Sequence, residues 1–208
     1  MKKHRIHRAF TLVEMLVVIV IIALLIAIAV PSIFRIRINI LASQTKATIN
    51  LLSIGCDHYH ADVDQYPPLW GGLNGRQSLV ECLTGYRDDD GKAGWGWRRE
   101  TRGTVYGPYN GAEKVETTRK ADPGATPAFI DSFGNQIYYY RYNGSGFNAG
   151  DNSDNGPADL GAYTNNPATG KPWTTKYVIM SPGPNGTWEA YNLAGGASSD
   201  DITSFVQE

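Results

Sequence analysis

A nearly unbroken apolar stretch close to the N-terminus is the feature that most constrains how this chain can fold. Residues 12–30 read LVEMLVVIVIIALLIAIAV, and Glu14 is the only ionisable side chain among them. At 1.5 Å per residue, a helix of this length extends about 28 Å, which matches the hydrocarbon core of a bilayer. The sequence therefore predicts a helix that crosses a membrane once.

The charges on either side of this stretch predict its orientation. Residues 2–8 carry four basic side chains and no acidic one, whereas Arg35 and Arg37 follow the stretch. Because the more basic flank of a membrane helix stays in the cytoplasm, we expect a cytoplasmic N-terminus. The remainder of the chain would then lie outside the cytoplasm.

The part of the chain beyond the helix is acidic. From residue 50 onward it contains 12 Lys and Arg against 19 Asp and Glu, a balance of −7. Nucleic-acid binding needs a basic face, so this balance argues against a nucleic-acid partner.

Glu14 distinguishes this stretch from an ordinary signal anchor. A carboxylate inside a membrane helix costs roughly 2.5–3.5 kcal/mol even on insertion scales. A secretory signal would be cut after its apolar run, where Ala27-Ile28-Ala29 has the small residues of such a site. A signal anchor has no use for the carboxylate, and we therefore expect another group to compensate its charge.

Residues 9–16, AFTLVEML, resemble the processing and methylation motif of type IV pilins and of type II secretion pseudopilins. The resemblance implies that a prepilin peptidase cuts between Ala9 and Phe10 and methylates the new amine of Phe10. This chain has Ala9 where the family prefers glycine. Pro31 stands where these subunits commonly have a proline, and we expect it to kink the helix or to loosen its hydrogen-bond ladder, because it lacks a backbone N–H.

Cleavage at this motif would give Glu14 a partner. The new amine of Phe10 is positive, and opposite charges attract far more strongly in lipid than in water. In a staggered bundle of helices, Glu14 of one subunit can meet the Phe10 amine of its neighbour. We expect this pairing to favour assembly and to set the axial step between subunits.

The helix is predicted to continue well past the membrane. Residues 32–62 contain no proline, and an apolar stripe recurs along them at helical spacing. Tyr66-Pro67-Pro68 should end the helix after about 50 residues. The members of the stripe are Leu41, Thr45, Thr48, Leu52, Cys56, Tyr59 and Val63.

The remaining patterns predict an α+β head. Residues 76–83 indicate a short second helix, and residues 86–126 a long loop or insertion. Residues 137–142 and 177–180 are aromatic or β-branched runs typical of strands, and the turn at 181–186 predicts a hairpin with 187–191. The expected fold is a long N-terminal helix packed on a small antiparallel sheet with long loops. The expected segments are a leader (1–9), a membrane and polymerisation helix (10–30), its amphipathic continuation (31–65) and a periplasmic globular head (66–208).

Three short stretches of the head resemble elements of the major pseudopilin of type II secretion systems. They are DSFGN at 131–135, MSPGPNG at 180–186 and DDI at 200–202. The end of the long helix, 57–67, also resembles the stretch where that family has a Tyr-Pro pair. These likenesses favour a type II secretion subunit over a subunit of a pilus fibre.

In that family the C-terminal loop binds Ca²⁺, a cation that takes six to eight oxygen ligands from irregular loops. The resemblance implies that Asp200 and Asp201 supply charge, Asn185 an amide oxygen, and the backbone near Met180 carbonyl oxygens. The alternative is a solvated acidic turn with no ion.

The two cysteines, Cys56 and Cys82, leave two possibilities open. An oxidising compartment would permit one disulfide between them, but the sequence cannot place their Cα atoms within bonding range. They could equally be two buried thiols.

The sequence contains no nucleophile elbow, no HExxH and no phosphate-binding loop, so it does not predict an enzyme. The resemblance implies a structural pseudopilin of a type II secretion-like periplasmic filament that drives export of folded proteins. It also implies a bacterial inner-membrane location and these partners: further copies of the chain, other pseudopilins, the peptidase, an inner-membrane assembly platform and membrane lipid. The alternatives are a major or minor type IV pilin, acting in adhesion, motility or DNA uptake, and a membrane-tethered surface-binding module.

Overall fold

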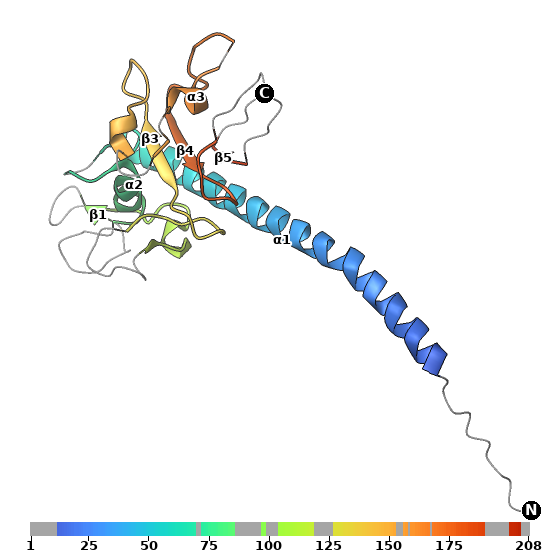
Figure 1. The fold of residues 1–208 in the computed structure, drawn as a ribbon. Helices are drawn as coiled ribbons and strands as arrows, with labels where there is room; N and C mark the ends of the chain where they lie inside the picture. The colour runs from blue at the N-terminus through green and yellow to red at the C-terminus, as the bar shows by residue number, and fades with distance from the viewer. Residues whose placement is uncertain are drawn as a thin grey trace, which may run out of the picture. The chain divides into compact units, whose positions relative to one another are not determined.

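The structure is a computed structural model that divides into two compact units, Met1–Ile40 and Leu41–Glu208. It describes residues 12–69, 72–85, 97–98, 104–118, 127–152, 156–157, 159–166, 168–189 and 200–204. Helix α1 (Leu12–Val63) begins in the first unit and ends in the second (Figure 1). The two units are described separately below.

Helix α1 has the length that the sequence predicts. It comprises 52 residues and continues through Pro31 without interruption. The hydroxyl of Ser32 donates to the carbonyl oxygen of Ile28, one turn back along the helix (3.2 Å). The helix ends where Asp64 takes a positive φ of 60°, just before Tyr66-Pro67-Pro68.

In the second unit α1 buries one face. The predicted stripe is confirmed at Thr45, Leu52, Cys56 and Tyr59, which are all buried. Leu41, Thr48 and Val63 are only half-buried, and Ile49 and Gly55 complete the buried face instead. A Cβ on Gly55 would lie 3.4 Å from Leu83, an ordinary van der Waals contact, so α1 and α2 pack closely at this residue.

Helix α2 (Gly75–Thr84) confirms the second helix predicted at 76–83. It begins with a capping box, in which the Asn74 side chain accepts from the Gln77 backbone (3.1 Å) and the Gln77 side chain accepts from the Asn74 backbone (3.3 Å). It ends at Gly85, whose φ of 66° is left-handed and whose N–H donates to the carbonyl oxygen of Glu81.

A three-stranded antiparallel sheet forms the centre of the second unit. Its strand order is β3 (Tyr138–Arg141), β4 (Tyr177–Ser181), β5 (Ile202–Thr203). Tyr139 pairs with Ile179, and Met180 pairs with Thr203. The strands predicted at 137–142 and 177–180 are confirmed, and so is the α+β fold class.

The hairpin partner predicted at 187–191 was wrong for the residues that the structure describes there, 187–189, which form no strand. The backbone N–H of Thr187 donates instead to the side chain of Asn185 (2.8 Å), a local bond that competes with pairing in a sheet. Strand β5 takes the place beside β4.

Both faces of the sheet are covered, which explains why all five residues of β4 are buried. One face contributes Tyr139 and Ile179 to a core with α1 and α2. The opposite face contributes Tyr138, Tyr140, Val178 and Met180 to a second core that includes Leu160 and Tyr163. The short helices η3 (Ala149–Asn152) and α3 (Gly161–Thr164) follow β3.

The region expected to be a long loop, 86–126, contains short elements in its described parts. Strand β1 (Trp97–Arg98) pairs antiparallel with β2 (Val105–Tyr106), and the turn η1 (Ala112–Lys114) follows. The backbone N–H of Tyr109 donates to the carbonyl oxygen of Leu83 (2.9 Å) in α2. The Asn110 side chain donates to the carbonyl oxygen of Leu51 (3.0 Å) in α1. This part of the insertion is therefore anchored to both helices.

Candidate functional site

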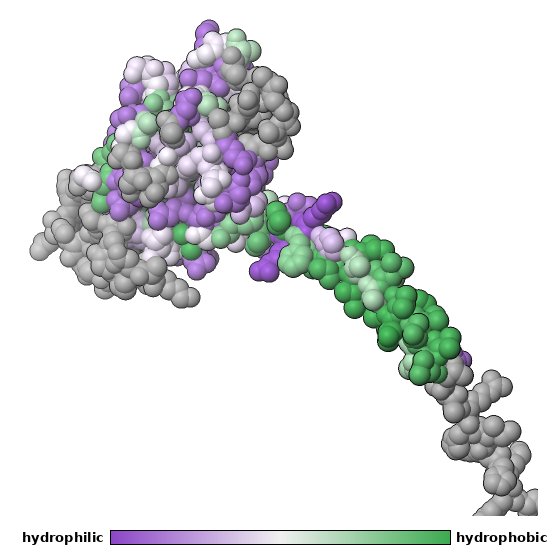
Figure 2. All heavy atoms as spheres, in the orientation of Figure 1, coloured by the Kyte–Doolittle hydropathy of each residue, from purple (hydrophilic) through white to green (hydrophobic). Residues whose placement is uncertain are grey.

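The first unit presents an exposed apolar helix. Every described residue of this unit, 12–40, has an exposed side chain. Figure 2 shows the face in view as largely apolar, with hydrophilic side chains toward the C-terminal part of this helix. Among the residues that the structure describes, α1 is the one helix long and apolar enough to cross a membrane, judged by length and composition. Such a surface needs lipid or protein around it, because water does not solvate it favourably.

Glu14 lies in the first turn of α1, with its side chain exposed. A negative charge at this end of a helix is favoured by the helix dipole. The predicted cleavage site, Ala9 and Phe10, lies outside the described residues. The structure therefore places the carboxylate at the start of the helix, but not the amine that we expect to neutralise it.

In the second unit, two of the predicted head motifs, at 131–135 and 180–186, are joined by hydrogen bonds. One carboxylate oxygen of Asp131 accepts from the backbone N–H groups of Phe133 and Asn135 (2.8 Å each). The other accepts from the hydroxyl of Ser181, at the end of β4 (2.5 Å). The Asn135 side chain then donates to the carbonyl oxygen of Gly183 (2.8 Å). The loop at 131–135 and the turn after β4 are thus one bonded unit.

The third motif packs against this unit. Gly183 has a φ of 64°, and a Cβ there would collide with the backbone oxygen of Asp200. Only glycine allows both the conformation and the contact. The backbone N–H of Glu189 also donates to the carboxylate of Asp201 (3.0 Å). All three motifs therefore meet beside the end of β4.

The predicted Ca²⁺ ligands are brought near one another but not into one shell. Asn185 uses its side-chain oxygen to accept from Thr187 and its amide nitrogen to donate to Glu189 (2.9 Å). Met180 is paired on both sides, with Tyr138 and with Thr203, inside the sheet. Within the described ranges, no group of three His, Cys, Asp or Glu side chains is placed to hold a metal ion.

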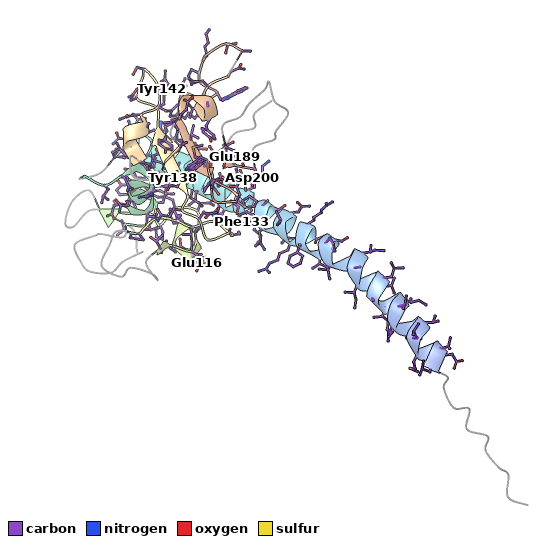
Figure 3. The ribbon with its side chains drawn as sticks, in the orientation of Figure 1. Glu116, Phe133, Tyr138, Tyr142, Glu189 and Asp200 are labelled. Carbon is purple, nitrogen blue, oxygen red and sulfur yellow. The ribbon has the colours of Figure 1, made fainter. Side chains whose placement is uncertain are left out.

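The Asp200 carboxylate lies in an environment that disfavours its charged form. Burial, and then the nearby charge of Glu189, raise the pKa of the Asp200 carboxyl above its usual value. Its buried Oδ1 has no hydrogen-bond partner. Figure 3 shows Asp200 and Glu189 close together near β4 and β5. Sequence reasoning missed Glu189, because no motif includes it.

One comparison with protein-family models matches the N-terminal part of the chain. Residues 4–30 match the family model described as the prokaryotic N-terminal methylation motif, which is characteristic of type IV pilin-like proteins. The chain carries the type IV pilin-like signature. Comparisons with curated proteins and with solved structures gave no match.

The match covers the residues that matter most for a pilin-like chain. Residues 4–30 include Ala9, Phe10 and Glu14, and they extend to the end of the predicted membrane stretch. A pilin-like motif implies processing by a prepilin peptidase and assembly with other pilin subunits. Together with the exposed apolar helix, it points to membrane anchoring of the chain.

The two cysteines are separate, buried thiols in the structure. Cys56 on α1 and Cys82 on α2 belong to the same core cluster. Burial raises the pKa of Cys82 to about 12, although a hydrogen bond with Tyr59 opposes the shift. Burial, and then the proximity of Cys82, raise the pKa of Cys56 well above its usual value. The arrangement of the two residues is that of packed core thiols.

Proposed function

We propose that this chain is a structural subunit of a type II secretion-like periplasmic filament, which it joins through α1. The observation that carries the proposal is the exposed apolar helix with Glu14 in its first turn, inside a matched methylation motif. Subunits wait in the inner membrane as single-pass proteins with their heads in the periplasm. The filament grows when a membrane platform transfers them into it, and growth drives export of folded cargo.

The electrostatics of Glu14 supply the driving force for orderly addition. Removal of residues 1–9 exposes the Phe10 amine four residues before Glu14. Inside a bundle of apolar helices the dielectric is low, so a carboxylate without a cation is costly and a paired one is far less so. An incoming subunit satisfies this need for a counter-charge when the amine at its N-terminal end lies against the Glu14 side chain of a neighbour. The same pairing fixes how far the neighbour is displaced along the axis.

The arrangement of the head supports the secretion role over the pilus role. The three stretches that resemble the major pseudopilin, at 131–135, 180–186 and 200–202, meet beside β4 through Asp131, Asn135 and Gly183. Stretches far apart in the sequence that build one structural unit are better evidence than separate short likenesses. A major or minor type IV pilin remains the alternative, and neighbouring genes for a secretin or for a retraction ATPase would distinguish the two.

The assembly role is tested by replacing Glu14. We expect Glu14→Gln to enter the membrane in normal amounts but to reduce filament yield at least about tenfold, because the neighbour's amine loses its counter-charge. Sheared filaments and membrane fractions are quantified by immunoblot. The matched control is Glu116→Gln, which neutralises an exposed carboxylate of the head and should leave the yield unchanged. Normal filaments from Glu14→Gln would refute the pairing.

We also propose that Ca²⁺ binds the C-terminal loop. The Asp200 and Asp201 carboxylates and the nearby Glu189 offer oxygen atoms of the kind that Ca²⁺ prefers, and binding would draw them together from their present, separate positions. The unpartnered Oδ1 of Asp200 and the raised pKa of this residue are what an uncompensated acidic cluster produces. Asn185 could contribute its amide oxygen by releasing Thr187. When bound, the ion would neutralise the cluster and attach the loop to the end of β4.

A further inference from the structure

Asparagine is followed by glycine at several places in this chain. Such a pair is chemically labile, because glycine has no side chain to keep its backbone nitrogen away from the asparagine amide. Attack of that nitrogen on the amide carbon closes a five-membered ring and releases ammonia. The surroundings of each pair therefore decide whether it reacts in the folded chain. The pairs are 74–75, 110–111, 143–144, 155–156 and 185–186, and Asn155 lies outside the described residues.

Two of the pairs are held by the helices. The amide oxygen of Asn74 caps α2, and Gly75 is buried where a Cβ would collide with the carbonyl oxygen of Tyr139. The amide nitrogen of Asn110 donates to the carbonyl oxygen of Leu51 in α1 (3.0 Å). Reaction at either pair has to break a contact that anchors the fold.

The pair after β4 is restrained at both of its nitrogen atoms. The amide nitrogen of Asn185 donates to Glu189 (2.9 Å), and the backbone N–H of Gly186 donates to the carbonyl oxygen of Gly183 (3.3 Å). The amide oxygen of Asn185 accepts from the backbone N–H and the hydroxyl of Thr187 (2.8 and 2.9 Å). The nucleophile and the leaving group of this pair are both engaged.

Asn143 and Gly144 form the pair that the fold leaves free to react. Both residues are exposed, and a Cβ on Gly144 would meet nothing within 4 Å. Within the described part of the chain, neither the amide nitrogen of Asn143 nor the backbone N–H of Gly144 donates a hydrogen bond. The leaving group and the nucleophile are thus unrestrained.

The amide oxygen of Asn143, in contrast, accepts three hydrogen bonds. Two come from the backbone N–H and the hydroxyl of Ser145 (3.1 and 2.9 Å), and one comes from the backbone N–H of Gly146 (3.1 Å). Negative charge develops on this oxygen when a nucleophile attacks the amide carbon, so donors already aimed at it stabilise the intermediate. They belong to a tight hairpin in which Gly144 takes a φ of 92°.

We propose that Asn143 is a site of spontaneous deamidation, activated by the three donors to its amide oxygen. The backbone nitrogen of Gly144 bonds to the amide carbon of Asn143 and loses its proton. The bond from that carbon to the amide nitrogen breaks, and ammonia leaves with the proton. Water then opens the succinimide at either carbonyl carbon, which gives aspartate or isoaspartate at position 143. The reaction takes place in the second unit and does not depend on the filament role.

Incubation of the full-length, detergent-solubilised chain at pH 8 tests the proposal. Peptide mass spectrometry follows the gain of about 1 Da at each pair, as the amide becomes a carboxylate. We expect Asn143 to react at least about fivefold faster than Asn110 and Asn185. The control is the same chain unfolded in urea, where the three pairs should react at similar rates because these hydrogen bonds are lost. Equal rates in the folded chain, or the same ranking in urea, would overturn the proposal.

The donors to the amide oxygen are tested at Ser145. Ser145→Ala removes the hydroxyl and keeps both backbone donors, so we expect deamidation at position 143 to slow at least about threefold. Thr187→Ala is the matched control, because it removes the corresponding hydroxyl at Asn185 and should leave the rate at position 143 unchanged. An unchanged rate in Ser145→Ala, or equal slowing by both variants, would overturn the activation by these donors.

The chain isolated from membranes provides a second test. Asn143-Gly144-Ser145 also has the N-x-S pattern of an N-glycosylation acceptor. We expect a mixture of asparagine, aspartate and isoaspartate at position 143, with isoaspartate detected by an isoaspartyl methyltransferase. A sugar on the amide nitrogen would show that another reaction uses this side chain, and it would overturn the proposal.

Discussion

At the scale of single residues, Asp131 shows how one carboxylate organises a loop. Only 5% of its surface is accessible to solvent, and its oxygens accept three hydrogen bonds, from Phe133, Asn135 and Ser181. A buried charge is tolerated when such bonds replace water, and each of these bonds comes from a residue of a predicted motif. The motif residues of the head thus have a structural explanation that does not require a metal ion.

Asp200 is different, and its pKa leads to a prediction. Because its pKa is raised in the folded chain, this group stabilises the fold most when protonated, and the stabilisation is lost as pH rises through the raised value. Asp200→Asn should therefore be more stable than the parent at pH 7 without Ca²⁺, and the difference should vanish near pH 3. Thermal unfolding of the detergent-solubilised chain measures both.

Calcium should remove the stability advantage of Asp200→Asn over the parent chain. We expect millimolar Ca²⁺ to raise the Tm of the parent by about 2–4 °C and to leave Asp200→Asn nearly unchanged. Mg²⁺ at the same concentration is the control, since it demands a more regular shell of ligands. An equal response of both chains to Ca²⁺ would contradict the proposed ligand set.

The thiols of Cys56 and Cys82 provide another prediction. Since the pKa of Cys82 is about 12, only about one Cys82 thiol in ten thousand is ionised at pH 8, and burial also raises the pKa of Cys56 well above its usual value. Maleimide should therefore label neither residue in the native chain. After denaturation without reductant it should label both, as read by intact mass. Labelling that appears only after reduction would show a disulfide in place of the thiols.

At the scale of elements, α1 was predictable and β5 was not. A continuous apolar run followed by a polar helix with an apolar stripe leaves no place for the helix to stop before Pro67, and the structure agrees. Strand β5 has only two residues, and it is defined by pairing with a strand more than 20 residues earlier. Such non-local pairing has no local pattern, so the local hairpin signal at 181–191 misled the prediction. The same reason hides Glu189, which meets Asp200 only through the folded loop.

The contact between the β4 turn and the chain before β5 can be tested at one glycine. Gly183→Ala places a methyl group against the backbone of Asp200, whereas Gly170→Ala, at nearly the same φ, meets nothing within 4 Å. Both variants lose the conformational freedom of glycine, so their difference isolates the collision. We expect Gly183→Ala to lower the free energy of unfolding by about 1–3 kcal/mol more than Gly170→Ala. Equal losses in urea unfolding would show that the loop does not pack there.

At the scale of the whole molecule, the two units are built for different surroundings. The described residues of the first unit are all exposed and mostly apolar, whereas the second unit buries two aromatic cores around a sheet. The acid near the helix start and the membrane stretch followed from the sequence, because they depend on residue type and spacing. The cleavage site between Ala9 and Phe10 is what the resemblance implies, and it stays a prediction. The buried cores of the second unit required the structure, because they depend on contacts between residues far apart in the sequence.

The account depends most on the chemistry of the N-terminus. Mass spectrometry of the N-terminal peptide from membrane-isolated protein tests it directly. We predict a chain that begins at Phe10 with a methylated amine, since only that cut leaves Glu14 beside a new positive charge. An intact leader, or a cut after Ala29, would remove that charge or the helix itself and would contradict the account.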